Sequence, residues 1–511
     1  MLVRGSKKLA FRVLQDLNNW VVSCTHLLHD GALKFSPMTR KPLKLSVAVL
    51  ACLGPASLAA VVGSGEGGTL DLTNPPNYAN QPVPPYITRD NTPQGNEITD
   101  QGAMLGRVLF YDPRLSRNDS VSCASCHQQE HAFSDTSLSS QGVAGQTARH
   151  SMRLINPRFS NERRFFWDER AANLEVQSTQ PIHDPVEMGF SGENGDPEFS
   201  ELEAKLAAIE EYQVMFTAVY GDGGVTEERM QNALAQFIRS IQSFDSKYDE
   251  GRSQVPADGA PFPNFTAAEN EGKRLFLAPP GGGPGPGPGS GAGCAACHQP
   301  PGFDIDPNSG HNGVTTSIGG GVDLTVTRAP SLRDLVAVDG TPHGNFMHNG
   351  QFATIDEVIG HYNAIPEVRP RLDPRLAGPP GSGGQRLNLT AADRANLQAF
   401  LETLTGSNVY TDPKWSTPFD EQGELSIVVL PTDGLEISFS GAGESRQATI
   451  LMSRGVPNVE YLFQSSHDLE AWGSTPVTAG FDGRISVTVD APVSEGHCFY
   501  RFAYPVEDEA P

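Results

Sequence analysis

Two stretches decide the fold of this 511-residue chain: Cys123-Ala-Ser-Cys126-His127 and Cys294-Ala-Ala-Cys297-His298. In each, a gap of two residues places both thiols on one helical turn, and the adjacent imidazole points the same way. Thiols with this spacing add across the vinyl groups of haem, and the histidine then ligates the iron. One such motif might be a redox dithiol, but two in one chain predict two covalently bound haem c groups. His127 and His298 are the expected proximal iron ligands.

A similar element precedes each of these motifs. Gly106-Arg-Val-Leu-Phe110 comes before the first, and Gly272-Lys-Arg-Leu-Phe276 comes before the second. Thr266-Ala-Ala-Glu269 introduces the second element with a capping-box pattern, which marks the start of a helix. This weak internal repeat predicts two copies of one helical module.

Further helices are predicted between and after the motifs. A buried stripe at helical spacing indicates a connecting helix and consists of Met230, Leu234, Phe237, Ile241 and Phe244. Thr390-Ala-Ala-Asp393 opens another helix. Residues 279–293 are almost entirely Gly and Pro, so they predict a loose insertion just before the second motif.

The pattern changes after about Asp412. Leu435-Glu-Ile-Ser-Phe439 and Ile485-Ser-Val-Thr-Val489 alternate apolar and polar residues, as strands do. We therefore expect a small all-β sandwich domain at residues 424–505, without a catalytic constellation. Cys498 within it is expected to be a buried single thiol.

The N-terminal part of the chain resembles an export signal. Met38 to Lys44 is basic, residues 45–58 are mostly apolar, and Ser57-Leu58-Ala59 has the form of a cleavage site. We expect residues 1–60 to comprise an extension and signal peptide, and residues 61–97 an irregular leader. A lipid anchor at Cys52 is the alternative. No other stretch is long and apolar enough to span a membrane, so the mature protein is predicted to be soluble and periplasmic, or otherwise exported.

The composition excludes one class of partner. The chain carries 60 acidic and 37 basic side chains, a formal net charge of -23. Such a surface repels nucleic acid, whereas a basic protein partner is compatible with it. The acidity is equally explained by solubility alone.

Motifs along residues 95–405 are similar to those of the bacterial di-haem cytochrome c peroxidase family, including its MauG-like branch. Besides the haem motifs, the resemblance rests on five segments: Leu109-Phe-Tyr-Asp-Pro-Arg-Leu-Ser116, Ala132-Phe-Ser-Asp135, Phe166-Trp-Asp-Glu-Arg170, Pro185-Val-Glu-Met188 and His348-Asn-Gly350. It implies a mainly α fold of two tandem cytochrome c-like helical haem domains. The first, at 98–250, would be peroxidatic, and the second, at 251–412, would transfer electrons.

The resemblance also implies roles for individual side chains. In the family, a glutamate and a glutamine line the distal pocket of the N-terminal haem, which reacts with hydrogen peroxide; the matching positions are Glu187 and Gln177. A carboxylate there can move the proton of peroxide, and an amide can orient it. Trp167 matches the tryptophan between the two haem groups, where it would relay electrons. A purely structural role as a core aromatic is compatible with the same position.

The resemblance leaves the remaining iron ligands open. Many family members block the N-terminal haem with a histidine, but the matching position falls near Gly142, so this haem is predicted to be open. His131 and His150 are the alternative mobile ligands. Counting from His348 places the sixth ligand of the second haem at Tyr362, as in the MauG-like branch. His361 and Met347 are its competitors.

Calcium binding is doubtful in this chain. Relatives hold a calcium ion between the haem modules with an asparagine and backbone carbonyls, but the asparagine position is His150 here. The stretch that usually precedes the later histidine also departs, reading His343-Gly-Asn345. Histidine suits a hard, oxygen-seeking ion poorly.

Three functions follow from the resemblance. The first is a periplasmic peroxidase that reduces hydrogen peroxide with electrons from a small redox protein, either a c-type cytochrome or a blue-copper protein. The second is MauG-like oxidation of a protein substrate, which Tyr362 and the missing blocking histidine favour. The third is a non-enzymatic di-haem electron-transfer protein, which the glutamate and glutamine at pocket positions argue against.

Overall fold

The computed structural model describes residues 22–23, 68–161, 163–280, 291–305, 310–325, 327–365, 370–378, 383–431, 434–467, 471–491 and 498–504. The predicted signal peptide at 1–60 and the centre of the glycine- and proline-rich insertion lie outside this part of the chain, apart from residues 22–23. The contacts divide the chain into two compact units. One is Glu66–Ile427, and the other consists of Val428–Pro511 and Met1–Gly65.

The larger unit is helical. Within the described residues its helices are α2 (Asp100–Tyr111), α3 (Cys123–Cys126), α4 (Leu174–His183), α5 (Phe199–Ala207), α6 (Glu210–Tyr220), α7 (Glu227–Ser240), α8 (Lys247–Ser253), α9 (Ala267–Leu277), α10 (Ile355–Asn363) and α11 (Ala391–Glu402). Two short ladders accompany them: β2 (Thr69–Asp71) pairs with β5 (Ser426–Val428), and β3 (His298–Gln299) pairs with β4 (Asp304–Ile305). None of the described helices is long and apolar enough to cross a membrane.

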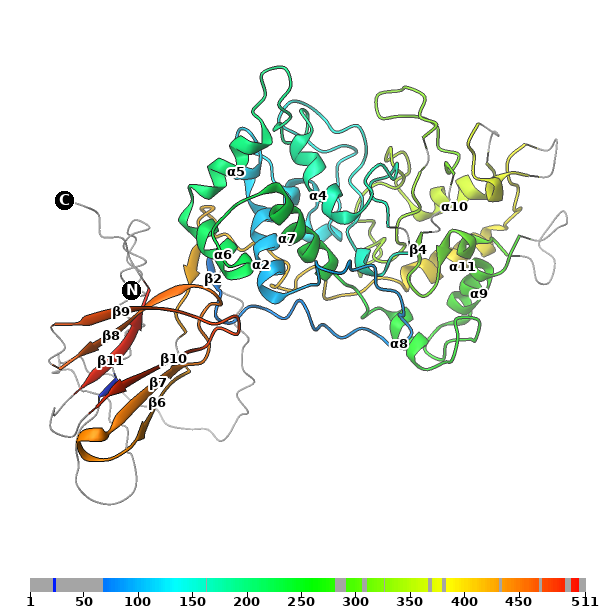
Figure 1. The fold of residues 1–511 in the computed structure, drawn as a ribbon. Coiled ribbons are helices and arrows are strands. Elements are labelled where there is room, and N and C mark those ends of the chain that lie inside the picture. The colour runs from blue at the N-terminus through cyan, green and yellow to red at the C-terminus, as the bar shows by residue number, and fades with distance from the viewer. Residues whose placement is uncertain are drawn as a thin grey trace, which may run out of the picture. The chain divides into compact units, whose positions relative to one another are not determined.

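Two helix pairs form the core of this unit and are built alike. Figure 1 shows α2 beside α7 in one half and α9 beside α11 in the other. A glycine lets each pair approach closely: a Cβ on Gly106 would lie 2.0 Å from the Ala233 carbonyl oxygen, and one on Gly272 would lie 1.9 Å from that of Asn396. The phenylalanine four residues after each glycine then packs against a phenylalanine of the partner helix. The ring centroids of Phe110 and Phe237 lie 5.2 Å apart, and those of Phe276 and Phe400 lie 5.3 Å apart. The predicted internal repeat therefore appears as a repeated helix crossing.

Local sequence signals set several of the helix ends. The predicted capping box at Thr266 is formed, and the helix start predicted at Thr390 is also a capping box, each closed by an acid three residues later. The predicted connecting helix is α7, and it contains the first three residues of the buried stripe. The prediction was wrong for Ile241 and Phe244, because α7 ends at Ser240. There the Ile241 carbonyl accepts a hydrogen bond from the Asn156 amide at 3.1 Å. The backbone of Ile241 is therefore bonded to a residue distant in sequence and does not continue the helix.

The smaller unit is a set of antiparallel strands, as predicted for the C-terminal region. Its strands are β1 (Val22–Ser23), β6 (Leu435–Ser440), β7 (Gln447–Met452), β8 (Glu460–Ser466), β9 (Gly473–Thr478), β10 (Ile485–Asp490) and β11 (Phe499–Ala503). They form one sheet of order β1-β11-β8-β9 and a second of order β10-β7-β6. Their packing as a sandwich stays a prediction. Cys498 is only half-buried, and its sulfur lies 3.4 Å from Nδ1 of His467.

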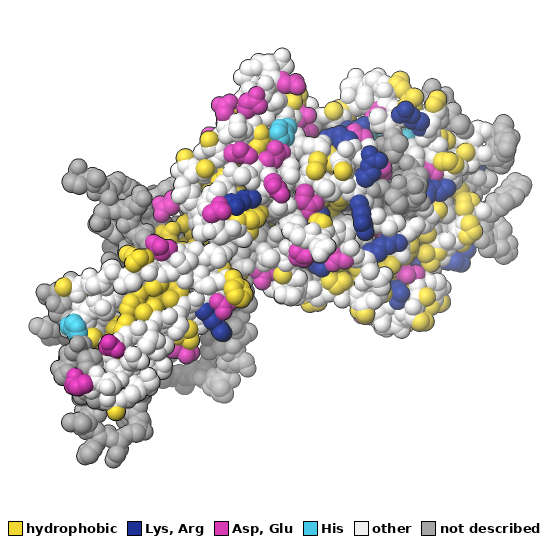
Figure 2. All heavy atoms as spheres, in the orientation of Figure 1, with side chains coloured by type: hydrophobic (Ala, Val, Ile, Leu, Met, Phe, Trp, Pro, Cys, Tyr) yellow, Lys and Arg dark blue, Asp and Glu magenta, His cyan; other side chains and the backbone are white. Residues whose placement is uncertain are grey.

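Charge is unevenly distributed over the helical unit. On the face drawn in Figure 2, acidic side chains gather over the half that carries α4, α5 and α6, whereas Lys and Arg side chains gather over the half that carries α9, α10 and α11. A charged partner would therefore be oriented as well as attracted by the field of this unit.

Candidate active site

Two cavities in the helical unit each contain one Cys-x-x-Cys-His motif. The first cavity has a volume of about 480 Å³ and is lined by Cys126 and His127. The second has a volume of about 620 Å³ and is lined by Cys294, Cys297 and His298. Both volumes fall in the range of about 300–1,000 Å³ that is usual for cofactor pockets. The cavities share one wall, formed by residues 150–153, Trp167, Arg328 and Pro330.

The first motif presents an imidazole suited to binding iron. Cys123 and Cys126 occupy the ends of α3, and His127 follows as its C-cap. Nδ1 of His127 lies 2.9 Å from the Phe133 carbonyl oxygen, so a proton on Nδ1 donates to that carbonyl and leaves Nε2 as a free ligand. Burial lowers the pKa of His127, which keeps the ring neutral as a metal ligand must be.

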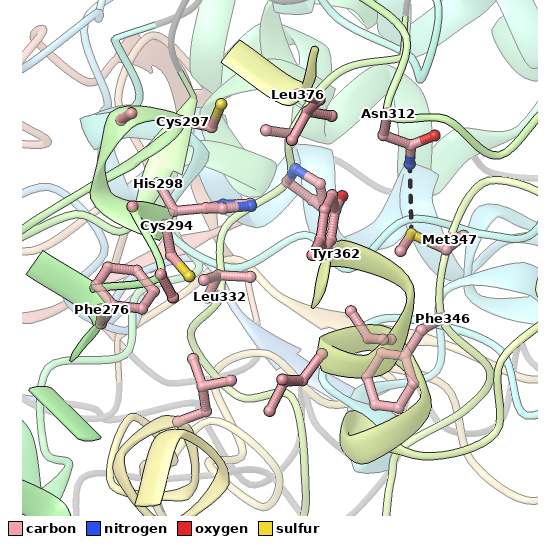
Figure 3. Close-up of a pocket in the computed structure, with 18 of the residues that line it drawn as sticks. Phe276, Cys294, Cys297, His298, Asn312, Leu332, Phe346, Met347, Tyr362 and Leu376 are labelled. Carbon is pink, nitrogen blue, oxygen red and sulfur yellow. Dashed lines mark hydrogen bonds between the residues drawn. The ribbon is translucent and has the colours of Figure 1, made fainter. Parts of the chain in front are cut away.

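The second motif differs in its local backbone. Cys294 to Ala296 form a single 3₁₀ turn, and His298 begins the short strand β3. Burial lowers the pKa of His298 to about 4, so this imidazole is also neutral at physiological pH. Figure 3 shows its ring extending into the second cavity from the side that carries Cys294 and Cys297.

The cysteines behave as buried thiols and not as a redox pair. None of the four motif cysteines is in a disulfide bond. Burial raises the pKa of Cys123 and Cys294 to about 12 and that of Cys126 to about 11. A catalytic dithiol needs a thiol whose pKa is lowered, the opposite of what is seen. Two thiols outside any disulfide, a neutral histidine and a cavity at each motif therefore fit haem c.

Glu187 and Gln177 both line the first cavity, together with His127. Gln177 lies on α4, and Glu187 lies in the turn that follows this helix. The Asp184 carboxylate at the end of α4 accepts hydrogen bonds from the Val186 and Glu187 amides at 2.8 and 3.1 Å, and so holds that turn. Burial, and then the charge of Asp184, raises the pKa of Glu187 to about 7. A carboxyl with this pKa can both accept and return a proton near neutral pH.

A tight loop holds Glu187 from the other side. The Val143 amide donates to the Glu187 carbonyl at 3.0 Å, and the Ala144 amide donates to that of Val186 at 3.1 Å. Gly142 packs so closely that a Cβ there would lie 2.2 Å from the Val186 carbonyl oxygen. The family resemblance places the blocking histidine of relatives near Gly142, and in this backbone conformation no side chain fits at Gly142.

Trp167 belongs to the wall that the two cavities share. Its side chain is 9 % exposed, and Nε1 donates to the His150 carbonyl at 2.7 Å. The indole is therefore fixed between the two cavities, as an electron relay requires. The same burial would suit a core aromatic, so the relay role stays a proposal.

Three side chains were predicted as candidates for the second protein ligand of the haem at His298, and their surroundings differ. Tyr362 lies on α10, and Figure 3 shows its phenol ring in the second cavity facing the His298 ring. Met347 also lines this cavity, but its sulfur accepts a hydrogen bond from Asn312 Nδ2 at 3.3 Å. Nε2 of His361 lies 2.9 Å from the Asn312 carbonyl oxygen, and His361 is not among the residues lining the cavity. Asn312 also hydrogen-bonds the Tyr362 side chain, so it contacts all three candidates. The Tyr362 ring facing His298 is the observation that supports Tyr362, and its role as a ligand stays a proposal.

The remaining histidines do not form a metal site with acidic neighbours. His150 is 4 % exposed, and its Nδ1 lies 2.9 Å from the Ser137 carbonyl oxygen. His131 does not line either cavity; its ring centroid lies 6.1 Å from that of His343. Over the described part of the chain, no three His, Cys, Asp or Glu side chains are grouped as metal ligands. Calcium binding through backbone carbonyls stays a doubtful expectation.

Comparison with known proteins identifies the family. Residues 100–254 match the family model described as di-haem cytochrome c peroxidase. Methylamine utilization protein MauG of Methylorubrum extorquens is 30% identical over 61% of this chain and 80% of its own length. The chain belongs to the di-haem cytochrome c peroxidase family, in its MauG-like branch. MauG of Methylophilus methylotrophus is 29% identical over 66% of this chain and 93% of its own.

A solved structure agrees with this membership. The crystal structure of a MauG-like protein associated with microbial copper homeostasis has a TM-score of 0.52 and 28% identity to this chain. The match between the two covers 66% of this chain and 99% of the chain of that structure. Haem c is the cofactor that membership in the di-haem cytochrome c peroxidase family implies.

Two features of this di-haem site were missed by reasoning from the sequence. Asp184 is three residues before Glu187, and the Asp184-Pro185 pair is a turn-initiation signal that could have revealed its role in holding the following turn. Arg153 lies in the wall between the cavities, and its place depends on contacts far along the chain. Arg153 belongs to no recognisable motif.

Proposed function

We propose that this chain is an exported di-haem peroxidase that reduces hydrogen peroxide to water with electrons from a small redox protein. The observation that carries the proposal is the grouping of Glu187, Gln177 and His127 around one cavity. Export agrees with the signal-like residues 38–60, and covalent haem attachment agrees with an exported protein.

The side chains of the first cavity supply the proton chemistry. The overall reaction consumes one hydrogen peroxide, two electrons and two protons, and yields two waters. Cys123, Cys126 and His127 would hold a haem group there, which would supply the site for peroxide and the electrons for its reduction. The Glu187 carboxylate would take the proton from the bound oxygen and return it to the leaving oxygen. The Gln177 amide would hold the substrate in line by hydrogen bonding.

The second cavity would receive electrons and pass them on. Cys294, Cys297 and His298 would hold the second haem group, and Tyr362 in the same cavity would keep substrate from it and favour its oxidised form more than a methionine would. Trp167, in the shared wall, lies where electrons would cross to the first cavity. The net negative charge of the whole chain suits a basic donor, either a c-type cytochrome or a blue-copper protein, whereas the Lys and Arg side chains over the half that carries α9, α10 and α11 would turn the basic face of such a donor toward the acidic half.

Steady-state turnover with peroxide and reduced cytochrome c tests this proposal. The haem content of the same preparation is measured first, and two haem groups per chain are expected. Turnover that falls steeply with ionic strength would support electrostatic docking of the donor. A fully loaded protein that oxidises no donor, basic or acidic, would contradict the peroxidase function.

A second candidate is oxidation of a protein substrate. Two observations favour it: Tyr362 in the second cavity, and the close packing of Gly142 that leaves no room for a blocking side chain. Two relatives named MauG also support it. Absorption spectra recorded after peroxide is added without any donor distinguish the candidates. An oxidised spectrum that persists for minutes supports protein oxidation, whereas prompt return to the resting spectrum supports the simple peroxidase.

A further inference from the structure

Tyr410 and Asp334 form a hydrogen-bonded pair close to the second cavity. The Tyr410 hydroxyl donates to Asp334 Oδ1 at 2.6 Å, the length of a bond from a hydroxyl to a charged carboxylate. Asp334 is fully buried, and the next residue in the chain, Leu335, lines the second cavity. Tyr410 itself is partly exposed. A phenol that shares its proton with a carboxylate can lose an electron while that proton moves to the carboxylate.

The same tyrosine is in contact with the segment of the first haem motif. Gln129 lies in the loop after this motif, and its Nε2 donates to the carbonyl of Val409, the residue before Tyr410, at 3.0 Å. The Tyr410 ring centroid lies 4.8 Å from that of His343, which lies 6.1 Å from that of His131 in the same loop. Three rings therefore connect this loop with Tyr410, and the pair with Asp334 is linked by direct contacts to the surroundings of both cavities.

Other tyrosines that donate to an aspartate have a different environment. In three further pairs of the described helical unit, the aspartate is also held by an arginine. The pairs are Tyr212 with Asp112, Tyr86 with Asp249 and Tyr248 with Asp258, and the arginines are Arg114, Arg333 and Arg252. An arginine in contact with a carboxylate resists its protonation. Asp334 takes part in no ion pair among the described residues, and its other hydrogen bond comes from the Gly406 amide at 2.9 Å, also to Oδ1.

The carboxylate of Asp334 is able to take up a proton. Its Oδ2 is buried without a hydrogen-bond partner; Ser243 is close enough to affect the pKa of Asp334 but completes no hydrogen bond with it. Burial raises the pKa of Asp334, which favours acceptance of a proton. The charges of Arg333 and of Arg153, which lines both cavities and forms no ion pair among the described residues, act in the opposite direction. They favour the ionised resting form that accepts the proton.

We propose that Tyr410 is a redox-active tyrosine, oxidised by one electron when hydrogen peroxide reacts with the haem-loaded chain and no donor protein is present. The inference rests on the proposed reaction with peroxide at the first cavity. Hydrogen peroxide takes two electrons and two protons and yields two waters. Tyr410 supplies one electron through the haem groups, which supply the other. The O–H bond of Tyr410 breaks, and its proton forms an O–H bond on the Asp334 carboxylate. The product is a neutral tyrosyl radical beside a neutral carboxylic acid, so no new charge is created in the buried site.

The test uses the full haem-loaded protein, mixed with hydrogen peroxide without a donor and frozen at intervals for electron paramagnetic resonance. Wild type should give a tyrosyl signal, identified by its narrowing when ring-deuterated tyrosine is incorporated. Tyr410→Phe and Asp334→Asn should each lose this signal while they retain both haem groups. Tyr86→Phe is the matched control and should keep the signal. Tyr86 is also partly exposed and donates to an aspartate at 2.9 Å, but that aspartate lies 2.8 Å from Arg333.

Two measurements on the wild type do not depend on the folding of a variant. A nitroso spin trap added with the peroxide should label the peptide that contains Tyr410, as identified by mass spectrometry. The tyrosyl signal should also appear more slowly in heavy water than in ordinary water, because the proton moves with the electron. Where a variant binds fewer than two haem groups, the spin trap decides for Tyr410 and the isotope comparison decides for Asp334.

The other outcomes overturn the inference. If peroxide leaves the absorption spectrum of the haem-loaded wild type unchanged, the proposed function fails and this inference fails with it. If the spectrum responds but no tyrosyl signal forms, only the inference on Tyr410 fails. A signal that survives Tyr410→Phe, a signal that Tyr86→Phe also abolishes, or a trap on another peptide would place the radical elsewhere. A signal that survives Asp334→Asn at the wild-type rate, or equal rates in the two kinds of water, would overturn proton transfer to Asp334.

Discussion

Glu187→Gln removes the carboxylate from the first cavity and keeps the size of the side chain. We expect the second-order rate constant for the reaction with peroxide to fall about 10²–10⁴-fold, the range for loss of a general acid-base group. Stopped-flow absorption of the haem-loaded protein measures this constant. Glu193→Gln is the matched control, because Glu193 is exposed, follows on the same segment and does not line the cavity.

The pH dependence of the wild-type rate constant tests the same carboxyl more finely. Glu187 has a pKa of about 7, raised by burial and by Asp184 from an ordinary 4.5. The base is ionised above its pKa, so about half is ionised at pH 7 and about a tenth at pH 6. The rate constant should therefore fall about tenfold from pH 8 to pH 6. Asp184→Asn keeps an oxygen for the turn but removes the charge, so the fall should move to lower pH.

Two results would refute this reasoning. A rate constant that stays flat from pH 8 to pH 6 would mean that no carboxyl with a raised pKa controls the reaction. A Glu187→Gln variant within threefold of wild type would mean that the proton is moved by another group. Either result would remove Glu187 from the proposed chemistry without affecting the assignment of haem to the two motifs.

Three further outcomes are expected. Tyr362→Phe should change the resting electron paramagnetic resonance (EPR) spectrum of the second haem, because the Tyr362 ring lies in the second cavity facing the His298 ring; an unchanged spectrum would exclude Tyr362 as a ligand. Trp167→Phe should slow electron transfer between the haem groups at unchanged haem content. Rapid-mixing spectroscopy measures the transfer rate, and equal rates in the variant and the wild type would contradict the relay. Gly272→Ala should destabilise the fold by about 1–3 kcal/mol, because its Cβ would lie 1.9 Å from a backbone oxygen of α11. Denaturant unfolding measures this, with Gly259→Ala, which meets no atom within 4 Å, as control.

Features encoded over a few residues were predictable from the sequence. The two cysteine motifs, the helix starts at Thr266 and Thr390, and the alternating strands of the C-terminal region all depend on local spacing. The family resemblance also predicted that Gln177 and Glu187 line the cavity of His127, although they lie 50 and 60 residues from it in sequence. Local pattern and resemblance together were enough to place the helical core and the chemistry-bearing side chains.

Features that depend on distant contacts were not predictable. The end of α7 is set by Asn156, whose amide captures the Ile241 carbonyl, so the hydrophobic period alone overestimated the helix. The unpaired charge of Arg153 emerges only when both cavities close around it. Likewise, the sequence indicates only that no histidine is present near Gly142. The structure shows in addition that the loop of Gly142 packs closely against the backbone of Val186 and Glu187. In each case the deciding partner lies far along the chain.

The account treats the two haem groups as unequal, and resting-state EPR with quantified haem tests that claim most directly. We predict equal amounts of two ferric species: a high-spin haem at His127, open on the side of Glu187, and a low-spin haem at His298, closed by Tyr362. Two low-spin haem groups would mean that the first is blocked by a protein ligand. Two high-spin haem groups would mean that Tyr362 does not close the second, and either result would contradict the division of roles.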